Sequence, residues 1–320
     1  MLLSFCAVVG GLVALVYAAD RFIIGAAALA KLLGVPALII GLTVVGIGTS
    51  LPEIVVAIIA SIQDKASLAI GNAIGSNITN IALVLGLSAM VAPLAVNTAL
   101  VRRELPALIA VSLLALILAW DGQFSVADGI ILLIGLAATL GAIAYFAKNS
   151  PDSDPITAEI EADVGENVSH SAAMGWLLVG LVLLPLSSQS LVWGASNIAT
   201  ALGVSDLVIG LTIVAIGTSL PELATALSAI KKGEHDLVLG NIVGSNLFNI
   251  LAVLAFPALL APGFIPDGLL VRDLPLMLAL TGVLYFMCWG RTPRISRFQG
   301  AMLFAVFLGY EALLYASRFQ

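Results

Sequence analysis

Long apolar stretches recur along the whole chain and are separated by short polar segments. Each stretch approaches the roughly 20 residues that an α-helix needs to cross the hydrocarbon core of a membrane. We therefore predict an all-α integral membrane protein with ten transmembrane helices. The predicted spans are residues 2–19, 36–62, 67–94, 105–120, 124–147, 172–199, 206–230, 237–261, 269–289 and 298–317.

The longest polar segment, residues 148–171, divides these spans into two sets of five. It contains Pro151 and Pro155, which disfavour one continuous helix. We interpret it as a flexible acidic linker between a first half, residues 1–147, and a second half, residues 172–320. Its acidic residues are Asp152, Asp154, Glu159, Glu161, Asp163 and Glu166.

Two sequence blocks of the first half recur in the second. GLTVVGIGTSLPE at 41–53 recurs as GLTIVAIGTSLPE at 210–222, and GNAIGSNITN at 71–80 recurs as GNIVGSNLFN at 240–249. Both pairs have the same offset, which indicates an internal duplication. Because each half has an odd number of spans, the second half must enter the membrane from the opposite side. The two halves are then inverted five-helix repeats, an arrangement common in secondary transporters.

Basic residues are unevenly divided between the two sides of this topology. The richer side should be cytoplasmic by the positive-inside rule. The linker then lies in the cytoplasm and both termini lie outside, and we expect the membrane to be a bacterial inner membrane. The richer side carries Arg21, Lys31, Arg102, Arg103, Lys148, Lys231, Lys232, Arg291, Arg294 and Arg297, and the other side carries Lys65, Arg272 and Arg318.

The composition agrees with a membrane protein. Hydrophobic residues make up 61% of the chain and charged residues only 10%, with a mean hydropathy of +1.13. A soluble domain has about a quarter of its residues charged. Basic stretches are too few and too short for nucleic-acid binding. The apolar start of the chain lacks the positive residues and cleavage site of a signal peptide, so we interpret it as the first span.

Glu53 and Glu222 each lie within an otherwise apolar span, at equivalent positions of the two repeats. A carboxylate at the centre of a membrane costs about 2.5 kcal/mol or more unless it is paired or solvated. A buried acid paired with a base is the structural alternative, but no Lys or Arg lies within the spans around these positions. We therefore interpret the two glutamates as ligands that face each other across the pseudo-two-fold axis.

The residues beside each glutamate suit a hard cation, which prefers carboxylate, hydroxyl, amide and carbonyl oxygens. Hydroxyl groups precede each glutamate by three or four residues, on or near the same helical face. Pro52 and Pro221 each free a backbone carbonyl one turn earlier, and neighbouring glycines loosen the helix further. Such opened backbone is tolerated in a membrane where it lines a cavity. The hydroxyls belong to Thr49, Ser50, Thr218 and Ser219.

The second block adds a serine and an asparagine on one helical face in each repeat. These pairs are Ser76 with Asn80 and Ser245 with Asn249. Packing of small residues between helices would explain the glycines of this block but not its costly polar side chains. We expect the remaining asparagines to hold helices together rather than to bind ions. They are Asn72, Asn77, Asn241 and Asn246.

No cofactor or enzymatic activity is expected. The sequence shows no soft-metal site, no nucleophile with a base, and no glycine-rich loop that would cradle the phosphates of ATP. Transport must then draw on an ion gradient, with lipid and the transported ions as the partners.

The paired GTSLPE and GSNxxN blocks resemble the alpha repeats of sodium/calcium exchangers, and the resemblance extends over essentially the whole chain. It implies an antiporter that exchanges Ca²⁺ for Na⁺, with Glu53 and Glu222 as central Ca²⁺ ligands shared with Na⁺. It implies that the backbone carbonyls near Gly46 and Ala215 contribute, and that Asn80 occupies a polar ligand position. Several microbial and potassium-dependent members have an aspartate where this chain has Asn249. The hydroxyl residues implied around the Na⁺ sites are Thr49, Ser50, Ser76, Thr218, Ser219 and Ser245.

We predict transport by alternating access, in which the outer helices 2–19 and 172–199 slide past a fixed core. The ion must neutralise the two carboxylates before the site can cross the apolar barrier, which enforces exchange. Three alternatives remain open. One is a cation/proton antiporter of the same fold, since two buried carboxylates also bind protons. The others are a passive cation channel and a membrane scaffold that transports nothing. The coupling ion, Na⁺, H⁺ or K⁺, is also left open.

Overall fold

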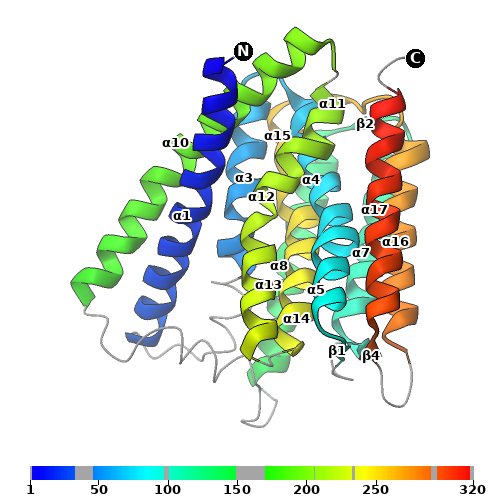
Figure 1. Cartoon of the computed structure of the whole chain (residues 1–320). Helices are drawn as coiled ribbons and strands as arrows, with labels where there is room; N and C mark the ends of the chain where they lie inside the picture. Colours follow the sequence, from blue (N-terminus) through cyan, green and yellow to red (C-terminus); the bar gives the residue numbers. More distant parts are fainter. Residues whose placement is uncertain are drawn as a thin grey trace.

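The computed structural model describes residues 2–32, 46–96, 101–148, 170–204, 206–232, 235–289 and 294–317. Its helices run side by side in one bundle, and both chain ends lie at the same end of it (Figure 1). An even number of spans places the termini in this way. Most of the predicted linker lies outside the described residues, which end at Lys148 on one side and resume at His170 on the other.

The first half consists of five helical segments in the described part of the chain. The segment with the GSN block is continuous, because an α-helix, a π-helix and a second α-helix follow one another. The elements are α1 (Leu2–Leu32), α3 (Gly46–Ile62), α4 (Ala66–Thr79), η2 (Asn80–Leu85), α5 (Gly86–Val91), β1 (Leu94–Ala95), α7 (Glu104–Leu118), β2 (Gln123–Phe124) and α8 (Val126–Lys148).

The second half repeats this order. Its described residues again form five helical segments, so the two halves give the ten that the apolar pattern predicts. The elements are α10 (His170–Leu202), α11 (Asp206–Ile209), η3 (Gly210–Val214), α12 (Ala215–Thr218), α13 (Leu220–Lys232), α14 (His235–Phe248), η4 (Asn249–Val253), α15 (Ala255–Leu260), β3 (Gly263–Phe264), η5 (Leu269–Asp273), α16 (Leu274–Met287), β4 (Arg294–Ile295) and α17 (Arg297–Ser317).

Two short strand pairs reveal the relation between the halves. Strand β1 pairs antiparallel with β4, and β2 pairs antiparallel with β3. Strands β1 and β3 follow equivalent helices, while β2 and β4 precede equivalent helices. Each ladder therefore joins one strand from each half. Since β1 is equivalent to β3 and β2 to β4, exchanging the two halves converts the β1–β4 ladder into the β3–β2 ladder. This is the pairing that a two-fold axis between inverted repeats produces.

The first helix is longer than its predicted span. Helix α1 continues past residue 19 to Leu32, although Asp20 and Arg21 interrupt the apolar pattern. The Arg21 guanidinium lies 5.2 Å from the ring centroid of Tyr17 and 4.7 Å from that of Trp176 on α10. These cation–π contacts accommodate the charge within the helix pair. Residues 36–45 of the predicted span 36–62 lie outside the described residues, and α3 begins directly after them at Gly46.

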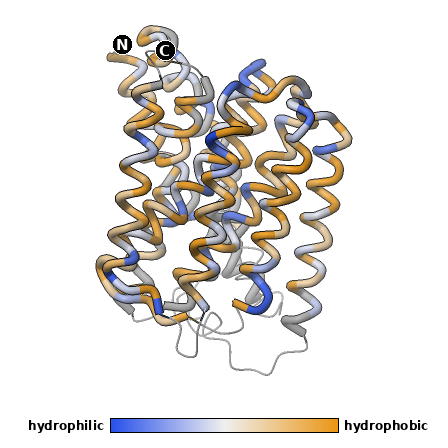
Figure 2. The backbone as a smooth tube through the Cα atoms, turned by 90° about the vertical axis from the view of Figure 1, so that its right-hand side faces the viewer, coloured by the Kyte–Doolittle hydropathy of each residue, from blue (hydrophilic) through white to orange (hydrophobic). Residues whose placement is uncertain are grey.

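The helices divide into an enclosed set and a lipid-facing set. The windows Ala66–Val91 and Val238–Leu260, which contain the GSN blocks, are largely buried, whereas Val126–Ile143 and Arg297–Ala316 are largely exposed. Hydrophobic residues cover most of the helical length, and hydrophilic stretches lie mainly toward the ends (Figure 2). Five helices of the described chain are long and apolar enough to cross a membrane, namely these four and Leu269–Met287.

Helices α1 and α10 lie against each other at one side of the bundle (Figure 1). A Cβ atom added at Gly194 would lie 2.7 Å from the carbonyl oxygen of Ser4, so glycine is needed for this close approach. A similar close approach brings α4 against η3, where a Cβ at Gly75 would lie 2.7 Å from Leu211 Cα. The first contact joins the two outer helices, and the second joins the two repeats inside the core.

Candidate functional site

Glu53 and Glu222 are buried inside the bundle. Glu53 lies on α3 directly after Pro52, and Glu222 lies in the first turn of α13 directly after Pro221. Both side chains are 0% exposed, and they are close enough for their charges to interact. The structure therefore brings together the two acids that the sequence places at equivalent repeat positions.

The two prolines have different local effects. Helix α3 continues through Pro52, whereas the second repeat breaks at Ser219, between α12 and α13. Because Pro221 has no N–H group, it cannot donate to the carbonyl of Gly217 four residues earlier. Among the described residues, the opened helix that the sequence predicts is thus present as a break in the second repeat and not in α3. The break turns Thr218 and Ser219 into the interior, where both side chains are buried.

Thr218 links three helices around Glu53. Its hydroxyl lies 3.2 Å from Oδ1 of Asn72, to which it can donate, and 3.4 Å from Oγ of Ser76. Asn72 in turn donates from Nδ2 to the backbone carbonyl of Glu53 at 3.2 Å. A continuous polar chain therefore runs from α12 through α4 to α3, all of it buried. This chain fixes the position of the Glu53 backbone relative to the second repeat.

About one helical turn after Ser76, asparagine side chains form hydrogen bonds between the two repeats. Asn80 donates from Nδ2 to Oδ1 of Asn246 at 3.0 Å, and Asn246 donates to the backbone carbonyl of Asn77 at 3.4 Å. The Asn77 side chain donates instead within its own helix, to the carbonyl of Ala73 at 2.8 Å. The expectation that these other asparagines hold helices together agrees with the contacts of Asn72 and Asn246.

Several buried oxygens of the candidate residues, those of Glu53 among them, have no hydrogen-bond partner among the described residues. Leaving a buried polar group unpaired costs about 1–3 kcal/mol, and more for a charged one. Such a cluster indicates a site that an ion completes, because a hard cation pairs with several oxygens at once. The atoms are both carboxylate oxygens of Glu53, Oγ of Ser50, Oγ of Ser219, Oδ1 of Asn80 and Oδ1 of Asn249.

The remaining candidate residues have varied positions. Ser245 is fully buried on α14 and makes interactions of its own. The Ala215 carbonyl accepts the N–H of Ser219 at 3.1 Å and lies 3.4 Å from the Thr218 hydroxyl, which can also donate to it. Gly46 and Thr49 lie in the first turn of α3, but the Thr49 side chain lies outside the described part of the structure.

The apolar pattern of the sequence does not predict the π-helical segments. η2 begins at Asn80 and η4 begins at Asn249, so each starts at a candidate ligand. A π-helical turn widens the helix locally, and such turns are frequent at functional sites. The N–H of Leu254 bonds to the carbonyl of Asn249 at 3.0 Å, which spans five residues. The repeated GSNxxN block marks these positions, but no residue type in it encodes a π-turn.

The chain matches a family model and known proteins over nearly its whole length. The model of the sodium/calcium exchanger protein family covers residues 3–144 and 172–316. A candidate antiporter, CaxA, from Alkalimonas amylolytica is 46% identical over 99% of this chain and all of its own. The sodium/calcium exchanger MaX1 of Methanosarcina acetivorans is 30% identical, with 98% of each chain covered.

Solved structures of the sodium-calcium exchanger NCX_Mj, soaked with Na⁺ and Sr²⁺, have the same fold. One of them superimposes with a TM-score of 0.69 at 34% identity, over 97% of this chain and 98% of its own. The two inverted five-helix repeats that the apolar pattern and the strand pairing indicate in this chain fit that fold. The chain belongs to the sodium/calcium exchanger family.

Proposed function

We propose that this protein exchanges Ca²⁺ for Na⁺ across a membrane and that both ions use the site between Glu53 and Glu222. The observation that carries this proposal is a group of buried oxygens, the Glu53 carboxylate oxygens among them, that have no hydrogen-bond partner within the described residues. It includes atoms from both repeats, since Ser50 and Asn80 come from the first, and Ser219 and Asn249 from the second.

The charge of the site suits one divalent ion. Two carboxylates carry a charge of −2 when both are ionised, and their mutual repulsion and desolvation make that state costly without a cation. Ca²⁺ takes six to eight oxygen ligands, which carboxylates, hydroxyls and amide oxygens can supply. Na⁺ accepts the same ligands, so the two ions compete for them. The hydroxyls of Ser50, Ser76, Thr218, Ser219 and Ser245, with Thr49, would complete the Na⁺ positions.

Competition for one site produces exchange when an empty site cannot move. To change sides without an ion, the protein would have to move two bare carboxylates past an apolar barrier. The free-energy cost of that movement prevents the unloaded protein from changing sides. Helices α1 and α10 are suited to be the moving gate, because they lie together at one side of the core (Figure 1). Leu12 of α1 lies against Gly217, directly beside Thr218. A sliding pair α1–α10 would therefore act on the break next to the site.

The topology follows from the same proposal. The halves are residues 1–147 and 172–320, and the family model leaves the intervening segment 145–171 unmatched. With the basic loops inside, the linker lies in the cytoplasm and both termini lie outside. We place the protein in the bacterial inner membrane with lipid and the two ions as its partners. Where the Na⁺ gradient points inward, the net result is Ca²⁺ export.

Reconstituted vesicles test the coupling. The purified protein is placed in proteoliposomes, and ⁴⁵Ca²⁺ uptake is measured under an outward gradient of Na⁺, of K⁺ or of H⁺, each alone. We expect uptake with the Na⁺ gradient only. Uptake driven by the H⁺ gradient alone would replace this proposal with Ca²⁺/H⁺ antiport at the same carboxylates. Steady Ca²⁺ flux without any counter-ion would indicate a channel.

A further inference from the structure

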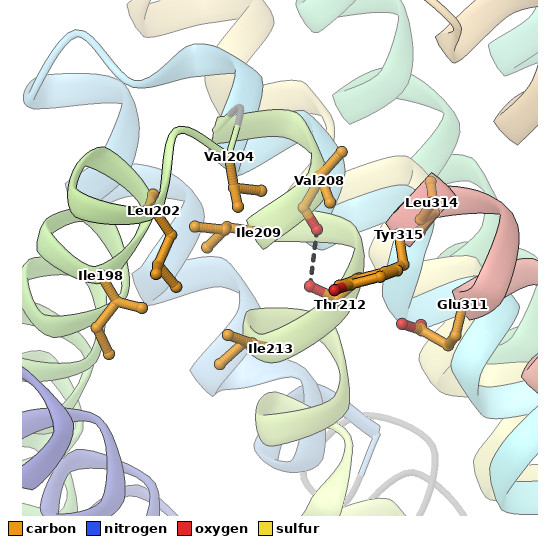
Figure 3. Close-up of a pocket in the computed structure, with 11 residues that line it drawn as sticks. Ile198, Leu202, Val204, Val208, Ile209, Thr212, Ile213, Glu311, Leu314 and Tyr315 are labelled. Atoms are coloured by element: carbon orange, nitrogen blue, oxygen red, sulfur yellow. Dashed lines mark hydrogen bonds between the residues drawn. The ribbon is translucent and has the colours of Figure 1, made fainter. Parts of the chain in front are cut away.

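A cavity that neither Glu53 nor Glu222 lines lies at the end of the bundle that the proposed topology places outside. It has a volume of about 230 Å³ and is bounded by the end of α10, by α11 and η3, and by α17 (Figure 3). We call it the outer cavity. Its wall is apolar over most of its surface, with Ile198, Ile209, Ile213 and Leu314 among its lining residues. It is therefore shaped for a hydrocarbon body rather than for a hydrated ion.

One charged side chain points into this apolar space. Glu311 of α17 extends toward Thr212 and Tyr315 in Figure 3. Its Oε1 atom is buried and has no hydrogen-bond partner within the described residues. The Thr212 hydroxyl does not fill this role, because it donates to the backbone carbonyl of Val208 at 2.8 Å. Within the described part of the chain, the outer cavity thus contains a carboxylate oxygen that lacks a donor, on a glutamate that is itself half-buried.

Glu311, unlike Glu53 and Glu222, has no acidic counterpart in the other repeat. Glu53 and Glu222 correspond to each other, and at the same offset Glu311 corresponds to Ala142. The carboxylate is therefore a feature of the second half alone. It lies six residues before the end of α17 at Ser317, near the outer membrane interface in the proposed topology. A group bound there can arrive from outside without passing the ion site.

We propose that the outer cavity binds an amphipathic organic ammonium, with the ammonium group at Glu311 and a short apolar body along the wall. A metal ion is a poor match because it needs several oxygen ligands, whereas Glu311 is the one carboxylate among the described lining residues. An anion would be repelled by Glu311. A neutral hydrocarbon would leave Oε1 without a donor, at the cost of an unpaired buried acceptor. An ammonium supplies N–H donors and a positive charge together.

Occupancy would affect transport through the walls of the cavity. Ile198 belongs to α10, the proposed gate, while Ile209 and Ile213 belong to α11 and η3 of the core. A molecule that bridges them resists relative movement of these elements, so we expect the ammonium to inhibit exchange. This second part rests on the proposed function, whereas binding itself does not.

Binding of radiolabelled octylamine to the purified protein in phosphatidylcholine nanodiscs tests the site. Octylammonium, octan-1-ol and octanoate have the same chain length and differ in head-group charge. We expect saturable octylamine binding, competition by unlabelled octylamine, and no competition by the other two at the same concentrations. Equal competition by octan-1-ol would overturn the proposal, because any hydrocarbon would then fill the cavity. Absence of saturable binding would also overturn it.

Two variants locate the bound amine. Glu311→Gln keeps the side-chain size and should weaken binding about tenfold or more, through loss of the charge-assisted contact. Asp267→Asn is the matched control, because it removes an exposed carboxylate outside the cavity lining and should leave octylamine binding intact. Unchanged binding in Glu311→Gln would contradict the site. Should that variant not fold, Ile213→Trp fills the cavity with Glu311 retained and must abolish saturable binding.

Flux measurements separate the two parts of the proposal. Na⁺-driven ⁴⁵Ca²⁺ uptake is recorded in the same preparations with and without octylamine, relative to each variant's own uninhibited rate. Inhibition in the wild type and its loss in Glu311→Gln would support action through the gate. If no Na⁺-driven uptake occurs at all, the proposed function fails while the binding result stands by itself.

Discussion

The side-chain amide of Asn80 donates to Oδ1 of Asn246 at 3.0 Å, across the boundary between the two repeats. Both residues are fully buried, and the contact uses the amide nitrogen of Asn80 while leaving its Oδ1 unpartnered among the described residues. Asn246 therefore determines which end of the Asn80 amide is available to an ion. We interpret Asn246 as a positioning residue for a candidate ligand rather than as a ligand.

Replacing Asn246 with alanine should weaken Ca²⁺ binding. Without its Oδ1 acceptor, the Asn80 amide can rotate and present N–H groups, which repel a cation, in place of its oxygen. We expect the Ca²⁺ concentration for half-maximal exchange to rise about tenfold, which corresponds to about 1.4 kcal/mol. Asn77→Ala is the control at the equivalent repeat position, because that side chain donates only within its own helix among the described residues. Equal effects of both variants would argue against positioning by Asn246.

Gly217 should be required for the contact between the gate and the core. A Cβ atom at this position would overlap Cδ2 of Leu12 on α1. Because only the end of the Leu12 side chain is in the way and can shift, the cost should lie at the lower end of the about 1–3 kcal/mol of overpacking, and we expect Gly217→Ala to slow Ca²⁺/Na⁺ exchange. Leu12→Ala in the same chain makes room for the new methyl group and should restore part of the rate.

The control for this pair is Gly141→Ala on α8, where an added Cβ meets nothing within 4 Å among the described residues. Exchange rates of all four proteins are compared in proteoliposomes at equal protein density. A Gly217→Ala protein that exchanges at the wild-type rate would show that Leu12 is not held against this glycine. So would a double variant slower than Gly217→Ala alone.

Asp273 is held at the start of α16 by two donors. Arg272 donates to it from Nε at 2.7 Å and from Nη2 at 3.1 Å, and the Tyr310 hydroxyl on α17 donates to its Oδ1 at 2.9 Å. Tyr310→Phe removes one donor from a fully buried carboxylate. We expect it to destabilise the protein by about 1–3 kcal/mol, seen as a lower thermal unfolding temperature in detergent.

The ion affinity should not change in Tyr310→Phe, because Tyr310 and Asp273 lie outside the candidate ion site. Tyr285→Phe on α16 is the matched control, since it removes a half-buried hydroxyl that does not contact Asp273. A Tyr310→Phe protein as stable as the control would show that the hydroxyl contributes nothing to the link between α16 and α17.

The sequence predicts the helices and the central acids because both follow from the cost of polar groups in a membrane. Long apolar runs must form helices there, so ten segments could be expected with bounds correct to a few residues. The same cost makes Glu53 and Glu222 conspicuous. The duplication then indicates that the two acids approach each other, and in the structure they do. The main error is α1, which continues through Arg21 because Trp176 from another helix covers the charge.

Other features depend on contacts between distant residues and could not be predicted. The π-turns at Asn80 and Asn249 follow from how the two repeats fit together, since the GSNxxN block is compatible with a regular helix. The break at Ser219 occurs in one repeat only, although Pro52 and Pro221 are equivalent in sequence. Local sequence cannot distinguish two copies of the same motif. The outer cavity is likewise formed by three separate elements, and Glu311 alone gives no sign of it.

Na⁺-driven ⁴⁵Ca²⁺ uptake in proteoliposomes by Glu53→Gln and Glu222→Gln, beside the wild type, tests the central claim most directly. Each substitution keeps the side-chain volume and removes one of the two charges that balance a divalent ion. We expect both variants to fold, as judged by a monodisperse elution profile, and neither to transport Ca²⁺. Wild-type uptake by either folded variant would contradict the account, because the Ca²⁺ ion would then not depend on that carboxylate.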